Sequence, residues 1–316
     1  MQQAPAKIIL FGEHAVVYGQ PAIAVPFTAL HATVESRATP PGTGLTIIAG
    51  DVGQLLHVEH PLAGGEPSGN ALIYAAQITL AKLKAPLPDL SLEIRSTIPV
   101  ASGLGSGAAV STALIRELSA ALGSPLQGDA LNALVYEVEK MHHGTPSGID
   151  NTVIVSGAPV YFVRGQAPQP FQIGTPLTLV VADSGIQAST RESVGAVREL
   201  YEQHPDSFGG YFEEIGALVK EARRYIEAGN LKEIGQLMNR NHILLSVLTV
   251  SSPLLNRLTG AARDAGALGA KLSGGGRGGN VIALVMSSTA DQVAEALRGA
   301  GAVRTWMTTV ETLETA

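Results

Sequence analysis

Hydrophobic and polar positions alternate along the chain with two different periods. Three stretches of the first half repeat apolar residues every three or four positions between Gly, Ser or Pro, which predicts helices at about 70–84, 106–122 and 128–143. Four others combine β-branched residues with partial alternation, which predicts strands at 6–11, 29–36, 44–49 and 89–95. We therefore expect the first half to open as a sheet and to continue as helices.

The second half mixes the same elements. A strand pair is predicted at 152–157 and 159–165, and residues 165–170, GQAPQP, are the most linker-like segment of the chain. Helices are predicted at about 190–204, 208–228, 231–246 and 253–265, followed by strand, glycine loop, strand, helix and strand. The pattern predicts an α+β protein with two domains, residues 1–170 and 171–316.

Composition narrows the class of protein. Hydrophobic residues make up 45% of the chain and charged residues 15%, enough apolar surface for a large core. The 27 acidic residues outnumber the 21 basic ones, and no long cationic run occurs, which argues against a nucleic-acid partner. The absence of cysteine fits a reducing compartment. No apolar stretch would span a bilayer and no signal-peptide core follows Met1, so we expect a cytoplasmic protein without a membrane partner.

A glycine-rich loop, PVASGLGSGAA at 99–109, follows a predicted strand and opens a predicted helix. The first amides of a helix lack internal partners and carry the positive end of its dipole, so they attract phosphate, and glycines let the backbone approach closely. The loop is neither a Walker A loop nor a dinucleotide fingerprint. Such loops also serve as plain strand-to-helix connections, so the loop alone leaves both functions open.

Two charged residues lie where burial is expected. Both faces of the strand that contains Lys7 are apolar, so its ammonium needs a carboxylate partner unless it reaches water at the strand start. Asp150 ends the segment GTPSGID at 144–150, whose turn-forming residues would hold the carboxylate on a stiff, partly enclosed loop. A purely structural aspartate in a turn is the alternative.

A third charged residue, Glu139, lies one helical turn beyond Val135 at the edge of an apolar stripe, which predicts a half-buried carboxylate. A magnesium ion that bridges ATP phosphates needs one or two such oxygens, whereas a solvated glutamate is the plain alternative. Glu139 and His142 also form the Glu-x-x-His spacing of di-metal carboxylate bundles, but the sequence has no second copy of it.

Four strings together resemble the GHMP superfamily of kinases, which also includes galactokinase and homoserine kinase. They are PAKIILFGEHAVVYGQPA at 5–22, PVASGLGSGAA at 99–109, EKMHHGTPSGID at 139–150 and KLSGGGRGGN at 271–280. The first and third strings look specifically like the mevalonate kinase family. The resemblance runs from end to end in the right order, and it implies a two-domain GHMP-kinase-like fold. That fold pairs an N-terminal ribosomal-S5-like domain with a C-terminal α/β sandwich domain, with the active site in the cleft.

Position by position, the resemblance implies roles for particular residues. Asp150 matches the catalytic base, Lys7 the lysine that pairs with it and with the substrate hydroxyl, and Glu139 the magnesium ligand. The implied substrate contacts are Glu13, His14, Ser147, Gly148 and Thr190. The implied ATP contacts are Ser96, Gly103, Leu104, Gly105, Ser106, Gly107, Ala108, Ala109, Gly275, Gly276 and Arg277. The loop 274–279 would border the site, and His14 could instead simply cap a turn.

The chain departs from the family pattern at two positions. Gly107 stands where close relatives usually have a second loop serine that contacts magnesium, so our hypothesis is that water or the Ser106 hydroxyl completes the magnesium shell. Arg277 lies in a loop that is often all glycine in relatives. Its cation would either help to neutralise phosphate charge or point to solvent, and the sequence leaves both open.

The expected reaction is ATP-dependent and Mg²⁺-dependent phosphorylation of the 5-hydroxyl of mevalonate, giving 5-phosphomevalonate for isoprenoid biosynthesis. The first alternative is a phosphomevalonate kinase or a kinase of another small alcohol. A phosphorylated substrate would call for extra cations near the pocket, and Arg191 is the one candidate that stands out. A non-catalytic ATP and metabolite sensor would be expected to lack the base or its lysine, and both are present. A homodimer is expected from the resemblance alone.

Overall fold

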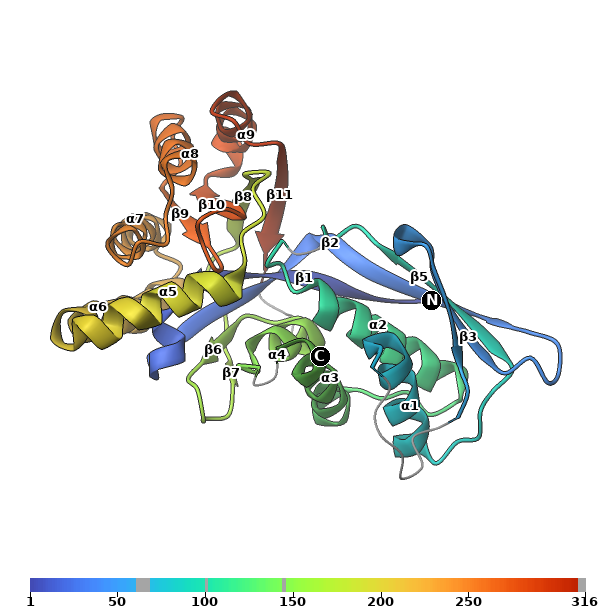
Figure 1. Ribbon diagram of the computed structural model, residues 1–316. Helices are drawn as coiled ribbons and strands as arrows, with labels where there is room; N and C mark the ends of the chain where they lie inside the picture. Colours follow the sequence, from blue (N-terminus) through green and yellow to red (C-terminus); the bar gives the residue numbers. More distant parts are fainter. Residues whose placement is uncertain (61–68, 100–101, 144–145, 312–316) are drawn as a thin grey trace. The chain divides into compact units, whose positions relative to one another are not determined.

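The computed structural model describes residues 1–60, 69–99, 102–143 and 146–311, which pack into two compact units (Figure 1). Unit 1 comprises Met1–Ala6, Leu30–Val100 and Gly105–Gly157. Unit 2 comprises Lys7–Ala29, Ala101–Leu104 and Ala158–Ala316. The predicted α+β class is confirmed. The predicted division at residue 170 stays a prediction, because the two units take alternating segments of the chain.

Unit 1 is a sheet with packed helices. Its strands are β1 (Gln2–Phe11) and β2 (Ala22–Ala38), which both continue into unit 2, and β3 (Leu45–Ala49), β4 (Gln54–Val58) and β5 (Leu90–Ser96). Its helices are α1 (Ala71–Leu83), α2 (Ser106–Ala121), α3 (Gly128–His143) and α4 (Ile149–Ser156). β3 pairs with β5 in parallel and with β4 antiparallel, and β5 pairs antiparallel with β2. The sequence predicted each of these elements except β4 and α4.

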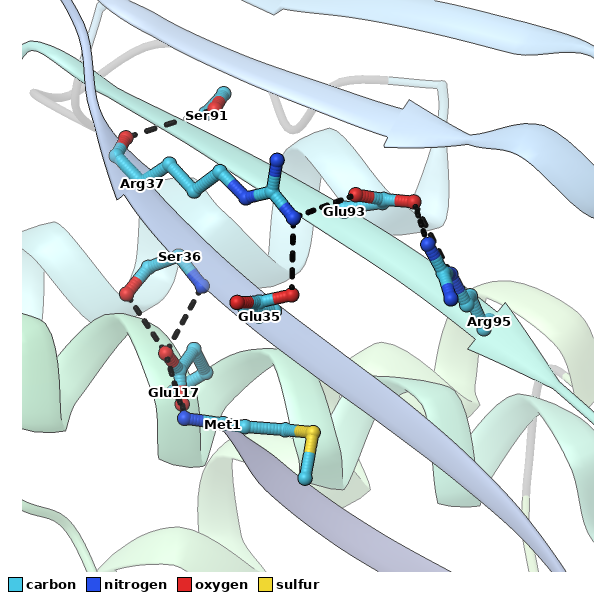
Figure 2. A network of polar contacts seen from close by, with 8 residues as sticks. All are labelled: Met1, Glu35, Ser36, Arg37, Ser91, Glu93, Arg95 and Glu117. Atoms are coloured by element: carbon cyan, nitrogen blue, oxygen red, sulfur yellow. Dashed lines mark hydrogen bonds and ion pairs between the residues drawn. The ribbon is translucent and has the colours of Figure 1, made fainter.

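The alternation of β2 and β5 gives the sheet one apolar and one charged face. Val34 and Leu92 are fully buried on the face that meets the helices. The opposite face carries a ladder of charges, in which the Arg37 guanidinium contacts Glu35 at 3.3 Å and Glu93 at 3.8 Å (Figure 2). Exposed ion pairs of this kind add little stability, so the ladder marks a solvated face.

The predicted strand at 152–157 is wrong, because these residues belong to helix α4. Their β-branched side chains favour a strand locally, but the helix lets Ile149, Val153 and Ile154 bury against α2 and α3. Gly148 begins the helix from a left-handed conformation, φ 88°. Asp150 therefore lies in the first turn of a helix and not on the predicted loop. Tertiary packing has overridden local propensity.

Unit 2 contains a second sheet, with the strand order β11-β8-β10-β9 and antiparallel neighbours throughout. These strands are β8 (Leu177–Asp183), β9 (Gly269–Ser273), β10 (Asn280–Val285) and β11 (Arg304–Val310). Two short strands, β6 (Val160–Phe162) and β7 (Gln169–Pro170), extend the start of β2. The predicted closing order of strand, glycine loop, strand, helix and strand is confirmed.

Helices α7, α8 and α9 pack against this second sheet, and α6 packs against α5 and α7 (Figure 1). The bounds are α5 (Thr190–Gln203), α6 (Pro205–Ala228), α7 (Leu231–Val247), α8 (Pro253–Asp264) and α9 (Ala290–Gly299). Across the described ranges, no helix has the length and hydrophobicity needed to cross a membrane.

Helix α7 covers the open edge of β9. The two backbones approach so closely that a Cβ at Gly235 or Gly269 would overlap the other segment. This approach lets Asn239 Oδ1 accept the Ala270 amide at 2.9 Å and His242 Nδ1 accept the Leu272 amide at 3.3 Å. Side chains of α7 thus satisfy outward amides of β9, which leads directly into the glycine loop.

Candidate active site

In unit 1, helix α2 begins at the predicted phosphate loop. Gly105 is its N-cap in a left-handed conformation, φ 76°, and within the described structure no side chain caps the first turn. Ala109 bonds back to Gly105 O at 3.0 Å and is buried, whereas Gly107 is exposed. The start of α2 therefore offers main-chain amides beside small residues, an arrangement suited to an anionic ligand.

Asp150 is half-buried in the first turn of α4, and the segment before it is tied down. Ser147 Oγ accepts the Ile149 amide at 3.3 Å, and the Tyr136 hydroxyl of α3 donates to Pro146 O at 3.4 Å. Residues 144 and 145 of the same motif lie outside the described residues. The carboxylate of Asp150 is thus carried by a helix start whose entry is fixed by α3.

Glu139 is 3% exposed, so it is more deeply buried than the half-buried position predicted for it. It lies on α3, which packs against α2 and α4. Ser96, at the end of β5, accepts the Ile98 amide on its hydroxyl at 3.2 Å and bonds Asp51 through its own amide at 2.6 Å. Searched over the described residues, no three His, Asp or Glu side chains form a metal cluster.

In unit 2, Lys7 is 5% exposed, and both faces of its strand are buried as predicted. Its amide donates to Leu104 O at 2.9 Å, and Leu104 is itself 2% exposed. This bond joins the strand of the predicted catalytic lysine to the first half of the predicted phosphate loop.

The Glu13 carboxylate forms a buried ion pair with Lys271, and its predicted contact with the substrate stays a prediction. The side chains are 1% and 0% exposed. Burial raises the pKa of Glu13, and the neighbouring ammonium offsets only part of that effect. Burial likewise lowers the pKa of Lys271. The sequence analysis missed Lys271, although the signal that picked out Lys7, a lysine inside an apolar strand, was present there too.

His14 lies beside the glycine loop. Its backbone is left-handed, φ 61°, and its Nε2 forms a hydrogen bond with Gly275 O at 3.0 Å. Burial lowers the pKa of His14 to about 4, and the positive charge of Arg277 acts in the same direction. The ring is therefore neutral near pH 7, with Nε2 as the donor and Nδ1 as an acceptor that no described residue occupies. Its side chain does not cap the short 3₁₀ helix Ala15–Tyr18 that follows.

The glycine loop 274–279 borders a pocket. The lining residues are Ser102, Gly103, Ala188, Thr190, Ser273, Gly275, Gly276, Gly278 and Gly279. Gly276 has a left-handed backbone, φ 77°, and a Cβ there would overlap Val250 O. Asn280 Nδ2, which the sequence analysis did not single out, donates to Ser102 O at 2.7 Å and holds Ser102 beside β10 within unit 2.

Arg277 also has a left-handed backbone, φ 61°, unusual for a residue with a Cβ. Its amide donates to Val250 O at 2.6 Å, and its exposed side chain lies near Thr249 O, with Nε at 3.4 Å. The guanidinium therefore lies at the surface of unit 2, and both predicted roles for it stay open.

The predicted site residues thus fall into two groups, each fixed within its own unit. Unit 1 holds Ser96, Gly105, Ser106, Gly107, Ala108, Ala109, Glu139, Ser147, Gly148 and Asp150. Unit 2 holds Lys7, Glu13, His14, Gly103, Leu104, Thr190, Gly275, Gly276 and Arg277. The pocket of unit 2 brings together Gly103, Thr190, Gly275 and Gly276.

Comparison with known proteins identifies the class to which this fold and site belong. Residues 70–158 match the GHMP kinases N terminal domain, and residues 213–303 match the GHMP kinases C terminal domain. A mevalonate kinase of Pyrococcus horikoshii is 37% identical over 96% of this chain and 93% of that protein.

Two solved structures agree with this result. The L. major mevalonate kinase in complex with R-mevalonate has a TM-score of 0.86 and 31% identity, covering 99% of this chain and 96% of that one. The Methanococcus jannaschii mevalonate kinase has a TM-score of 0.83 and 26% identity, covering 99% of this chain and 98% of that one. The chain belongs to the GHMP kinases and, within them, to the mevalonate kinase family.

Proposed function

We propose that this kinase transfers the γ-phosphoryl group of ATP to the 5-hydroxyl of mevalonate, giving 5-phosphomevalonate and ADP. The observation that carries the proposal is the hydrogen bond from the Lys7 amide to Leu104 O, 2.9 Å long. It ties the strand of a buried lysine to the loop residue that directly precedes Gly105, the N-cap of helix α2, and the first turn of α2 offers main-chain amides to an anion.

In the proposed reaction, Asp150 takes the proton of the 5-hydroxyl while that oxygen attacks the γ-phosphorus. The bond between this phosphorus and the β–γ bridging oxygen breaks, and ADP leaves. Lys7 stabilises the negative charge that develops on the attacking oxygen, and the amides at the start of α2 hold the phosphates. Phosphoryl transfer depends mainly on such positioning and electrostatic stabilisation.

Of the two predicted substrate contacts next to each other in the chain, His14 is the one that we assign to the substrate, and the contact predicted for Glu13 stays a prediction. Its Nε2 is occupied by Gly275 O, and its buried Nδ1 has no hydrogen-bond partner within the described residues. A neutral imidazole in this state accepts a hydrogen bond from an alcohol, and mevalonate has a second hydroxyl to donate. Thr190, in the pocket lining, would supply a further hydroxyl.

Magnesium fits the residues of unit 1. The ion usually takes one or two protein oxygens together with phosphate oxygens and water, so it needs no large cluster of carboxylates. Glu139 is a buried carboxylate on a helix packed against α2, and Ser106 supplies a hydroxyl at the first position of α2. These two residues would hold the ion, which when bound neutralises charge on the ATP phosphates. A cytoplasmic location and a homodimer stay predictions.

The test is a substrate panel of mevalonate, 5-phosphomevalonate, homoserine and galactose, each with ATP and magnesium, followed by ADP release and product mass. We expect turnover on mevalonate alone. Asp150→Asn should lower kcat by about 10²- to 10⁴-fold with a smaller change in KM. Asp129→Asn, an exposed aspartate in the first turn of α3, is the matched control and should leave kcat unchanged.

Turnover on a different member of the panel would keep the phosphotransfer mechanism and reject mevalonate as the substrate. Bound ATP without turnover on any of the four alcohols would instead favour an untested alcohol or a sensor. An Asp150→Asn variant as active as the parent would reject Asp150 as the base.

A further inference from the structure

Three polar side-chain contacts join residues 9–14 to residues 271–275 inside unit 2. The Ser273 hydroxyl donates to Ile9 O at 2.9 Å, the Lys271 ammonium contacts the Glu13 carboxylate, and His14 Nε2 bonds Gly275 O at 3.0 Å. Together they tie the end of β1 and the turn after it to the end of β9 and the first half of the glycine loop.

The ion pair is the most deeply buried of these contacts. Lys271 is 0% exposed and Glu13 1%, compared with 5% for His14 and 8% for Ser273. The same ammonium donates to Leu272 O at 2.7 Å. Lys271 therefore holds the Glu13 carboxylate against the main chain of β9 at the point where the strand leads into the pocket.

The other edge of β9 is fixed as well. His242 Nδ1 accepts the Leu272 amide at 3.3 Å, so its Nε2 carries the proton and donates to Asn256 Oδ1 at 3.1 Å. Since α7 and α8 hold β9 from this side, the strand is a rigid base on which Lys271 can position Glu13 and the residue after it, His14.

We propose that Lys271 is a positioning residue, which through Glu13 holds His14 and the glycine loop in one fixed arrangement and contacts neither the alcohol nor the nucleotide. The effect on turnover rests on the proposed function. A buried ion pair adds less stability than an apolar pair of the same volume commonly would, so stability alone gives little reason for it. Misplacing a binding group by about 1 Å can cost about 10²-fold in rate, which gives fixed geometry a functional value.

The kinetic test compares Lys271→Met, Glu13→Gln and the double variant Glu13→Leu/Lys271→Met, in which the site is filled with apolar side chains. We expect each single variant to lose about 10- to 100-fold in kcat, with less than about 3-fold change in the KM for mevalonate. Because the two residues act as a unit, the double variant should lose no more than the worse single variant. Lys82→Met and Glu295→Gln, both exposed, are matched controls and should be as active as the parent.

Three kinetic results would overturn the proposal. A Lys271→Met variant whose kcat is within about twofold of the parent value would show that the ion pair does not position any group needed for turnover. A Glu13→Gln variant that raises the KM for mevalonate about tenfold at constant kcat would make Glu13 a direct substrate ligand. Multiplied losses in the double variant would show that the two residues act independently.

A second measurement does not depend on the substrate. The His14 ring should titrate near its parent pKa of about 4 in the control variants, and its pKa should rise toward the ordinary value of 6.5 in Lys271→Met, because the loosened ring meets more water. NMR titration of the histidine ring protons follows this directly. An unchanged His14 titration would contradict the positioning role. If the parent fails to phosphorylate mevalonate, the proposed function fails while this measurement still decides whether Lys271 positions His14.

Discussion

Glu117 in unit 1 and Glu13 in unit 2 are both buried glutamates, and they differ in the donors that meet the carboxylate. Glu117 on α2 is 5% exposed and accepts the Ser36 amide at 2.9 Å, the Ser36 hydroxyl at 2.7 Å and the Met1 ammonium at 3.1 Å (Figure 2). Glu13 in unit 2 is 1% exposed and meets the Lys271 ammonium. Its Oε2 has no hydrogen-bond partner among the residues that the structure describes.

The pKa values of these two carboxyls move in opposite directions. Burial raises the pKa of Glu117, but the bonds from Ser36 and the Met1 ammonium outweigh burial and bring the pKa below its ordinary value. Burial raises the pKa of Glu13 and Lys271 compensates only in part, so this pKa stays above its ordinary value. Several donors therefore secure the buried negative charge of Glu117, whereas Lys271 is the main partner of the Glu13 carboxylate, with smaller help from the backbone at Glu13 and Gly274.

The largest expected effect is the loss of Lys271, the charged partner of Glu13. Lys271→Met leaves an unpaired buried carboxylate and should lower the free energy of unfolding by about 3–5 kcal/mol at pH 7, measured by urea unfolding. A Glu13 carboxyl with a raised folded pKa costs no stability below its unfolded pKa of about 4.5 and costs more as the pH rises through the folded pKa. The deficit should therefore shrink at pH 4. The double variant Glu13→Leu/Lys271→Met should recover most of the lost free energy of unfolding, because it removes the buried carboxylate as well. A Lys271→Met variant as stable as the double variant would show that the unpaired carboxylate costs nothing.

The next largest effect comes from the two buried histidines of unit 2. Burial lowers the pKa of both His14 and His242 to about 4. The unfolded chain binds protons at these rings near pH 6.5, so stability should be complete above that pH and fall as the pH drops toward 4, by up to about 3 kcal/mol for each histidine. Urea unfolding between pH 7 and 4 measures the loss. Replacing His242 with Gln should remove about half of this pH dependence, and a stability that is flat over this range would show that the rings are not buried.

The sequence predicted the fold best where burial follows one period over many residues. Helices α2, α3 and α7 keep an apolar stripe from end to end, and their observed bounds differ from the predicted ones by a residue at most. Prediction was wrong at α4, where a β-branched segment is helical because of the elements packed on it. The strand β4 was missed, since its alternation is weak and its residues are mostly exposed.

The sequence named candidate site residues, whose roles stay predictions, but it did not give their contacts. The motif strings named Glu13 and His14, yet the partner of Glu13 lies 258 positions away, and no local pattern gives the register that joins them. The same holds for Asn280 and Ser102, which are 178 positions apart. Burial of Lys7 and Glu139 was partly predictable because alternation and helical spacing report on burial directly. Contacts between residues so far apart in the sequence could be found only once the fold was known.

The smallest effect tests the better-satisfied carboxylate. Glu117→Gln keeps the shape of the side chain but removes the charge that Ser36 and Met1 meet, and it should cost about 1–2 kcal/mol at pH 7, measured by urea unfolding. Because the folded pKa of Glu117 is lowered, its contribution is present above the ordinary value of 4.5 and is lost as the pH falls through the folded pKa. The difference in unfolding free energy between parent and variant should therefore vanish in acid. The Lys271→Met deficit also shrinks in acid, but for the opposite reason: there protonation removes an unfavourable buried charge, whereas at Glu117 it removes a favourable one.

The folded-state pKa separates the two cases, because it is raised for Glu13 and lowered for Glu117 from the same ordinary value. The Lys271→Met deficit should begin to shrink as soon as the pH drops below the raised folded pKa of Glu13, and so at a higher pH than the Glu117→Gln deficit. Arg95→Ala is the control on the same sheet, since its bond to Glu93 at 2.7 Å is exposed and its removal should leave the unfolding midpoint unchanged (Figure 2). If both deficits disappeared at the same pH, the number of donors would not be what distinguishes the two buried carboxylates.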